Sequence, residues 1–165
     1  MRSLLSWVFA AGLAFPLGCS VWAESDLFMR TVGFALTGTD DVEVKVIDRT
    51  RCVFAINNDL FRLNNVYTDR IKIQGQRRQW LGVLEQWVAV ELLGGEVVFE
   101  KTVEPPRDDG SELTRQMRLQ SPSLFEPHHY TYTQHELFLA TNDQDRVKTA
   151  WQYIYSHGCT GKQSR

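Results

Sequence analysis

An unbroken apolar run near the start of the chain is its strongest hydropathy signal. Residues 4–16 carry no charge, follow a positively charged start, and precede small residues that include Val21 and Ala23. A positive start, an apolar stretch too short to remain as a membrane span, and small residues at the positions that a signal peptidase recognises are typical of a secretory signal peptide. We therefore predict cleavage after Ala23, with residues 1–23 as the signal peptide and residues 24–165 as one exported domain.

Cys19 allows a second interpretation of the same segment. A lipoprotein signal places small residues before a cysteine that becomes the lipidated N-terminus, and Gly18 meets that requirement. Pro16, however, stands where such signals carry an aliphatic residue. We therefore favour a free periplasmic or secreted protein over lipid anchoring through Cys19.

Helical periodicity appears at both ends of the remaining chain. Residues 25–36 repeat apolar positions at helical spacing, and polar turn residues follow them. Residues 141–157 form the clearest helical pattern, in which Thr141 and Gln144 have the spacing of a capping box and Gly158 is a favoured stop. The apolar face of this second helix consists of Val147, Ala150, Trp151 and Ile154.

Strand patterns fill the middle of the chain. Residues 42–46 alternate apolar and charged positions, which indicates a half-buried strand. Residues 52–56 are apolar throughout, which fits a strand buried on both faces. Further strands are predicted at residues 60–63 and 135–140.

A glycine pair suggests the clearest hairpin. Residues 87–92 and 96–100 are strand-like, and Gly94 and Gly95 between them would supply the positive φ that tight hairpin turns need. The polar residues 74–80 before this unit are expected to form a loop.

The order of elements indicates the fold class. Residues 104–134 are left unassigned, because residues 105–110 suit an exposed loop and residues 113–119 suit either a helix or a strand. The rest runs helix, several strands, helix, without the strand–helix alternation of a parallel sheet. We therefore predict an α+β domain, a mostly antiparallel sheet with an N-terminal and a C-terminal helix packed on it.

Charge and length exclude several classes of protein. Removing 23 of the 165 residues leaves 142, and Arg2 is the only charge removed from 18 Lys and Arg and 20 Asp and Glu, so the net charge becomes −3. Such a chain lacks the basic footprint of a nucleic-acid-binding protein and the polybasic stretch that binds anionic lipid. No second apolar run is long enough to form a transmembrane segment.

The two cysteines beyond the leader predict a disulfide. Cys52 and Cys159 form an even pair, and disulfides persist in the oxidising compartments that exported proteins reach. The alternatives are two separate buried thiols or a shared metal. Zinc sites usually bring cysteines in closely spaced couples, which this pair is not.

Four segments together resemble a family of small exported bacterial proteins without an assigned activity. They are residues 34–41 (FALTGTDD), 52–54, 63–71 (LNNVYTDRI) and 150–159 (AWQYIYSHGC). The resemblance covers most of the chain after the leader. It implies export and a paired cysteine framework, and it implies no particular chemistry.

Histidines are the remaining candidates for catalysis. His128, His129 and His135 lie close together in the sequence, and Glu136 follows the last of them. His135 and Glu136 would point to opposite faces of one strand, and no helical metalloprotease motif is present. We therefore regard these four residues as a weak candidate site and predict no tightly bound metal and no other cofactor.

Aromatic residues crowd the same part of the sequence and recur at two other positions. Aromatic side chains at strand spacing usually belong to the core, although they can line a ligand pocket or an interface. The residues concerned are Trp80, Trp87, Phe125, Tyr130, Tyr132 and Phe138. We expect them to contribute mainly to the core.

These observations favour a non-enzymatic exported protein that binds a protein or a small-molecule partner. The alternatives are a small histidine-dependent hydrolase and a structural component of the cell envelope. An enzyme should bring its histidines and a carboxylate into one cleft. A binding protein should disperse them and expose an apolar patch instead.

Overall fold

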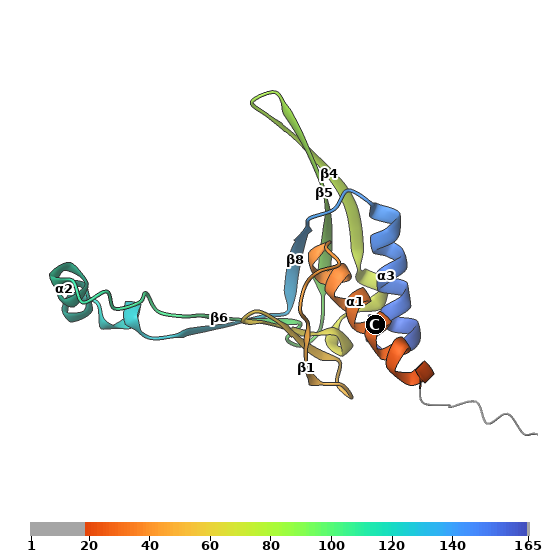
Figure 1. Cartoon of the computed structure of the whole chain (residues 1–165), viewed down its shortest axis with the longest axis horizontal. Coiled ribbons are helices and arrows are strands. Elements are labelled where there is room, and N and C mark those ends of the chain that lie inside the picture. Colours follow the sequence, from red (N-terminus) through yellow and green to blue (C-terminus); the bar gives the residue numbers. More distant parts are fainter. Residues whose placement is uncertain (1–18, 165) are drawn as a thin grey trace, which may run out of the picture.

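The computed structural model describes the backbone of residues 19–164, and the side chains of residues 25–164 apart from that of Trp80. Two antiparallel sheets meet at the centre of the molecule, two helices pack against it on one side, and two long hairpin arms project from it (Figure 1). The predicted α+β class, with a helix near each end of the chain, is confirmed. The strands form two sheets instead of one.

The larger sheet has the strand order β1-β2-β3-β6-β7 and is antiparallel throughout. Its strands are β1 (Lys45–Asp48), β2 (Val53–Ile56), β3 (Asp59–Arg62), β6 (Phe99–Val103) and β7 (His128–Tyr132). Strand β2 is buried along its whole length, which confirms the prediction for residues 52–56. The strand predicted at residues 42–46 starts later, because Val42 and Val44 pack beside the core and pairing with β2 begins only at Lys45.

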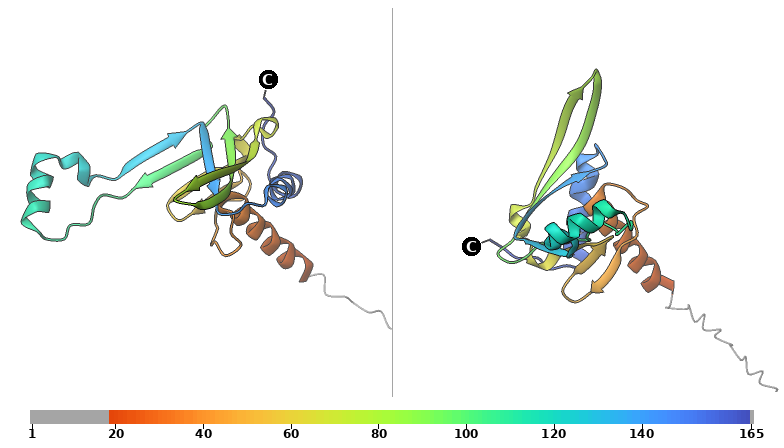
Figure 2. Two further views of the ribbon diagram at one scale, coloured as in Figure 1. Left: turned by 90° about the horizontal axis from the view of Figure 1, so that it is seen from above. Right: turned by 90° about the vertical axis from the view of Figure 1, so that its left-hand side faces the viewer.

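The smaller sheet has the order β4-β5-β8 and supports both long helices. Its strands are β4 (Lys72–Trp80), β5 (Val83–Leu93) and β8 (Gln134–Leu139), and the helices are α1 (Cys19–Thr37) and α3 (Gln144–His157). The inner face of this sheet buries Val88, Val90 and Leu92 of β5 with Leu137 and Leu139 of β8. Helices α1 and α3 lie against each other beside this face (Figures 1 and 2).

The predicted disulfide is present and joins the two halves of the core. Cys52 directly precedes β2 and Cys159 follows α3, with their Cα atoms 5.7 Å apart. Beside it, Gly158 ends α3 as predicted, with its N–H donating to the Ile154 carbonyl. The ring of Phe28 from α1 lies so close that a Cβ on Gly158 would meet it at 2.4 Å. Glycine is therefore required here for helix packing.

Both predicted helices form, but their first residues differ from the predictions. Helix α1 begins at Cys19, six residues before the predicted start, and residues 1–18 of the predicted leader lie outside the described part of the chain. Cleavage after Ala23 stays a prediction and would remove the first turn of α1. No helix within residues 19–164 is long and apolar enough to cross a membrane.

The predicted capping box of the last helix is wrong. Asp143 caps α3 instead, because its carboxylate accepts the N–H of Arg146. Thr141 accepts the N–H of Asp143, and the amide of Gln144 donates to the Ile73 carbonyl of β4. The predicted apolar face is confirmed, since its four residues are all buried.

The predicted hairpin and the loop before it are both wrong. Residues 74–80 lie in β4, which pairs with β5 over its whole length, and β6 belongs to the other sheet. Neither Gly94 nor Gly95 has a positive φ. A Cβ on Gly94 would meet the Asn65 carbonyl and one on Gly95 the Tyr67 hydroxyl, so close approach of other segments accounts for these glycines.

Residues 104–134 contain a helix and a strand that the sequence pattern left unassigned. Helix α2 (Glu112–Gln120) and the 3-10 turn η3 (Pro122–Phe125) precede β7, and the expected loop at residues 105–110 is present. Two further 3-10 turns, η1 (Leu63–Asn65) and η2 (Thr68–Arg70), connect β3 to β4. The strands predicted at residues 60–63 and 135–140 correspond to β3 and β8, each shifted by one residue.

Candidate functional site

Two arms carry most of the exposed large apolar side chains among the described residues. The β4–β5 arm consists of residues 76–87, and the β6–β7 arm consists of residues 101–131 with α2 at its end (Figures 1 and 2). The exposed apolar residues on the arms are Leu81, Val83, Leu84, Val103, Leu113, Met117, Leu119, Leu124 and Tyr130. The arms extend in different directions from the body (Figure 1).

The end of the β4–β5 arm is a two-residue turn with an unusual residue in it. Leu81 has φ 50° and Gly82 has φ 79°, between the paired residues Trp80 and Val83. Turns with two positive φ values join antiparallel strands well, and they favour Asn-Gly because a bulky side chain at positive φ is strained. Leu81 is also 87% exposed. Leucine is therefore unfavourable at this position for two reasons: its apolar side chain is exposed to water, and its backbone has a positive φ.

Two more apolar residues complete this surface. Val83 and Leu84 follow the turn, point to opposite faces of the two-stranded ribbon, and are both exposed. We call residues 81–84 the β4–β5 tip. The strands behind it present polar residues to solvent, among them Gln79 and Gln86. The tip is thus a small apolar surface with a polar border.

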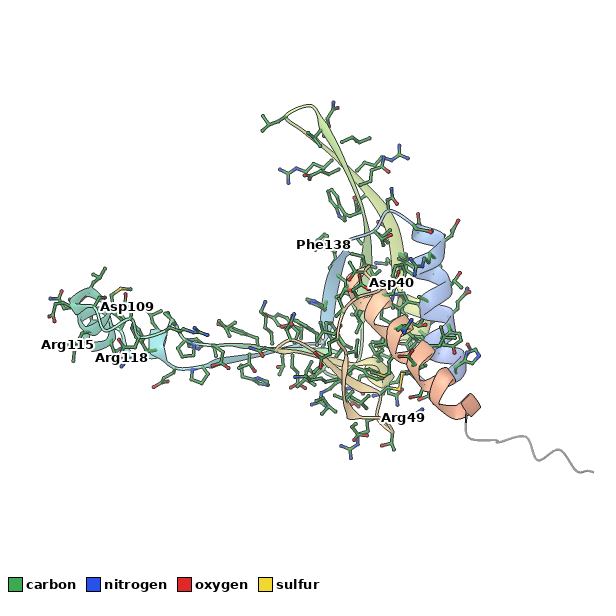
Figure 3. The ribbon with its side chains drawn as sticks, viewed as in Figure 1. Asp40, Arg49, Asp109, Arg115, Arg118 and Phe138 are labelled. Carbon is green, nitrogen blue, oxygen red and sulfur yellow. A yellow bond between two sulfur atoms is a disulfide. The ribbon has the colours of Figure 1, made fainter. Side chains whose placement is uncertain are left out.

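The outer face of the three-stranded sheet continues the apolar surface toward the body. Phe138 of β8 lies opposite Ala89 of β5 and is 67% exposed, and Figure 3 shows it on the side of β8 that faces away from the helices. Trp87 lies on the same face, two residues from Ala89, and its indole N–H is buried without a hydrogen-bond partner among the described residues. The prediction that the aromatic residues contribute mainly to the core is wrong for the described side chains. None of Trp87, Phe125, Tyr130, Tyr132 and Phe138 is buried, and the last three are exposed.

Local contacts hold the end of the β6–β7 arm. Ser111 caps α2 by accepting the N–H of Thr114, and none of the residues of α2 is buried. Hydrogen bonds from the Thr114 hydroxyl and from the Ser111 N–H lower the pKa of Asp109 to about 2. The guanidinium of Arg118 lies 4.8 Å from the ring centre of Phe125. Helix α2 is therefore held by contacts within the end of this arm, where it packs against η3.

His129 belongs to a polar cluster on one face of the larger sheet. Its Nε2 lies 3.3 Å from a carboxylate oxygen of Glu100, and its Nδ1 lies 3.1 Å from the Thr102 hydroxyl. The same Glu100 accepts a hydrogen bond from Nε of Arg62 on β3. This cluster braces the base of the β6–β7 arm.

His135 lies on the opposite face and has a different environment. Its ring stacks on that of Phe99, with centroids 3.7 Å apart, and Phe99 pairs with Tyr132 on β7. Burial lowers its pKa below the ordinary value. Strand alternation puts Phe99 and Glu100 on opposite faces, so His135 and His129 lie on different sides of the sheet.

The remaining two members of the predicted weak site are also apart. His128 pairs with Val103, four residues along β6 from Phe99, which places it roughly 13 Å from the His135 stack. Glu136 follows His135 on β8 and therefore points to the other face. The structure brings none of the three histidines together with another or with Glu136. Within the described residues, no group of three or more His, Cys, Asp or Glu could hold a metal ion.

Hollows also lie on the helix side of the molecule, away from these histidines. One, of about 360 Å³, lies beside the disulfide and is lined by Ser25, Phe28, Arg49, Cys52, Tyr153, His157 and Gly158. Another, of about 300 Å³, lies between α1 and α3 and includes Phe34 and Arg146. Arg146 pairs there with Asp40 at 2.6 Å and lies over the Phe34 ring at 3.9 Å.

Comparisons of the chain with protein families, with curated proteins and with solved structures find no match. Sequence reasoning missed the β4–β5 tip, and one signal could have found it: Leu81-Gly82 has the position of an Asn-Gly hairpin turn between two strands of matched length.

Proposed function

We propose that the chain is a non-enzymatic exported protein that binds a partner protein through the β4–β5 tip, with Leu81 as the central contact. The observation that carries this proposal is the position of Leu81, at positive φ and 87% exposed at the end of a long arm. Backbone strain that folding does not need is often associated with function. An exposed leucine at such a site stabilises the protein only when another surface covers it and removes it from water.

A protein partner fits the shape of the tip better than a small molecule. Small ligands bind in concave pockets that surround most of their surface, whereas the tip is a narrow projection. A projecting apolar residue with a polar border is what a pocket on another protein can enclose. Burying one leucine fully contributes about 1.5–3 kcal/mol, so Leu81 alone could be a major contact.

A protein pocket also fits better than a lipid surface. Arg77 and Arg78 lie on β4, and Glu85 of β5 stands opposite Arg78 in the strand register. The tip therefore lacks the strong positive charge that attracts anionic membranes. Glutamines between these charges suit hydrogen bonding to a protein surface. Binding to vesicles is therefore an outcome that would contradict the proposal.

The histidine-dependent hydrolase is less well supported. Such an enzyme needs a nucleophile or base and a carboxylate within hydrogen-bond distance. His129 does lie beside Glu100, but both belong to the pairing that braces the arm with Arg62. No specific observation favours the structural envelope role over partner binding.

The test uses the full-length chain, expressed with its own leader in the native host. A photo-reactive amino acid at position 81 should cross-link one defined protein, and Leu81→Asn should abolish recovery of that protein. The matched control is position 27, because Leu27 is also an exposed leucine but lies on α1, apart from both arms. Equal cross-linking at both positions, or none at position 81, would contradict the proposal.

A vesicle assay separates the lipid alternative. Purified protein should stay unbound when mixed with vesicles of phosphatidylglycerol and phosphatidylethanolamine and floated on a density gradient. Flotation that Leu81→Asn abolishes would show that the tip binds lipid instead of a protein pocket.

A further inference from the structure

Besides the β4–β5 tip, the edge strands of the two sheets are a second place where another chain could bind. An unpaired edge offers a row of backbone N–H and C=O groups to any strand that can reach it, and soluble proteins usually protect such edges with charges, prolines, bulges or covering segments. The two sheets have four edges: β1, β7, β4 and β8.

Three of these edges are protected. Strand β1 contains a bulge between Val46 and Asp48. Strand β4 carries Lys72, and the Gln144 side chain of α3 occupies its Ile73 carbonyl. Strand β8 lies against α1. Directly after β8, the N–H of Ala140 donates to the carbonyl of Thr37 at the end of α1.

Strand β7 has none of these protections among the described residues. It runs from His128 to Tyr132 without a lysine, arginine, aspartate, glutamate or proline, and every residue of it is exposed. Its pairing with β6 is regular over five residues and contains no bulge. A straight, unprotected edge of this length is a ready template for another strand.

The side chains of β7 are complementary to those of a second β7. In an antiparallel pair centred on Tyr130, each Tyr130 lies opposite its counterpart, and His128 lies opposite Tyr132 of the second copy. On the other face, His129 lies opposite Thr131. Aromatic pairs directly across two strands stabilise a sheet, and no acid meets an acid and no lysine or arginine meets another in this register.

We propose that the chain forms a two-fold symmetric dimer in which the β7 strands of two copies pair antiparallel about Tyr130. The two five-stranded sheets then become one continuous ten-stranded sheet. Such an interface is isologous, so it closes on itself and leads to a dimer and not to a fibre. This inference goes beyond the proposed function, since it uses the other arm and a different partner.

The pairing also explains the exposed end of the β6–β7 arm. Because the strands run in opposite directions, residues 113–124 of each copy extend past the base of the second copy's arm toward the body of that copy. The exposed Phe138 lies there on the side of β8 that faces away from the helices (Figure 3). No residue of helix α2 is buried within its own chain, where η3 is the element that packs against it, and the dimer then gives the helix a further surface. A nine-residue helix with so little packing is marginal in water.

The apolar area on offer is sufficient for a stable dimer. Seven exposed apolar side chains lie along this surface, namely Leu113, Met117, Leu119, Leu124, Tyr130, Tyr132 and Phe138, with exposed fractions between 40% and 76%. At about 200 Å² for each large side chain, they offer roughly 800 Å² on each copy. A stable protein–protein interface buries about 800 Å² on each partner.

Cysteine cross-linking tests the register directly. Tyr130→Cys should form a covalent dimer under mild oxidation, because the two sulfur atoms would lie across one antiparallel pair. Val46→Cys is the matched control, since Val46 lies on the β1 edge and is 46% exposed against 45% for Tyr130. Both variants are made in full-length chain carrying Cys19→Ser, so that only the new cysteine can react.

Charge repulsion tests the same pairing without a covalent bond. Tyr130→Lys places two lysines opposite each other, and it should raise the dimer dissociation constant at least tenfold in analytical ultracentrifugation, whereas Tyr130→Phe should not change it. Circular dichroism checks that the lysine variant remains folded. Leu81→Asn should leave the dimer intact, which separates this inference from the proposed function.

Three results would overturn the inference. The first is a monomer at 100 μM in sedimentation equilibrium. The second is a dimer that cross-links as well through position 46 as through position 130. The third is cross-linking of Tyr130→Cys to a different protein in the host, which would identify β7 as the binding edge for a foreign strand.

Discussion

His135 of β8 stacks on Phe99 of β6, with ring centroids 3.7 Å apart and planes inclined by 11°. This contact joins the two sheets at the base of the β6–β7 arm, and Phe61 of β3 lies beside it. An imidazole at this position is half-buried in an aromatic environment. The stability of the junction therefore depends on the charge of the ring.

We expect the protein to lose stability as the pH falls below about 6.5, and His135 to account for part of the loss. Burial lowers the pKa of His135, an effect that nearby Asp59 opposes and Lys101 reinforces. The unfolded chain then binds a proton at a higher pH than the folded one, so stability is highest above the unfolded value and falls from there down to the folded value. Thermal unfolding at pH 7 and pH 5 measures this difference.

A variant assigns the effect to one residue. His135→Phe keeps a ring on Phe99 and removes the titrating group, so its thermal midpoint should fall less between pH 7 and pH 5 than that of the wild type. His157→Phe, at an exposed position at the end of α3 where the ring stacks on Tyr153, serves as the control. An equal fall in wild type and His135→Phe would rule out a contribution from the stacked ring.

The position directly after helix α3 should tolerate no side chain, because the Phe28 ring occupies the space beside it. In Gly158→Ala, the new Cβ would lie 2.4 Å from the Phe28 ring. We expect a loss of about 1–3 kcal/mol in the free energy of unfolding, which is typical of overpacking. Urea denaturation measures the loss.

The same experiment in a Phe28→Leu background identifies the cause. If the Phe28 ring is the obstacle, Gly158→Ala should cost less there than in the wild type. An unchanged cost would place the strain elsewhere in the junction between α1 and α3.

Reduction of the Cys52–Cys159 disulfide should destabilise the protein strongly. The bond spans 107 residues and connects β2 to the end of α3. The chain-entropy model gives about 4–5 kcal/mol for a loop of this length. The thermal midpoint should therefore drop in dithiothreitol, and a Cys52→Ala, Cys159→Ala double variant should match the reduced protein. A midpoint insensitive to the reductant would show that the bond does not support the fold.

The sequence predicted the elements whose burial follows from their own pattern. Residues 52–56 are buried on both faces, and Val147 to Ile154 form one buried helical face, so each pattern reports its surroundings directly. Pairing was harder to predict. The glycines at 94 and 95 suggested a tight turn, although the segments that they connect lie in different sheets and the glycines make room for Asn65 and Tyr67.

The arms could not be predicted for a physical reason. Periodicity identifies a strand when one face meets a core and the other meets water. Water surrounds both faces of the β4–β5 arm, so residues 74–80 show the polar pattern of a loop. The weak histidine site was wrong for a different reason. Its four residues are close in the sequence, but successive strand residues point to opposite faces, and the chain passes from one sheet to the other at residue 133.

Replacing Leu81 by asparagine should stabilise the free β4–β5 arm while it weakens partner binding. Asparagine adopts positive φ with less strain than leucine and is well solvated, so Leu81→Asn should favour the closed hairpin by about 1 kcal/mol. Amide hydrogen exchange in β4 and β5 near the tip should slow about fivefold, since 1.4 kcal/mol corresponds to a factor of ten. Leu84→Asn is the control, because it removes a similar exposed leucine at a position without positive φ. Slower exchange in both variants would mean that solvation alone opposes Leu81, whereas slower exchange in Leu81→Asn only would show that its backbone is strained.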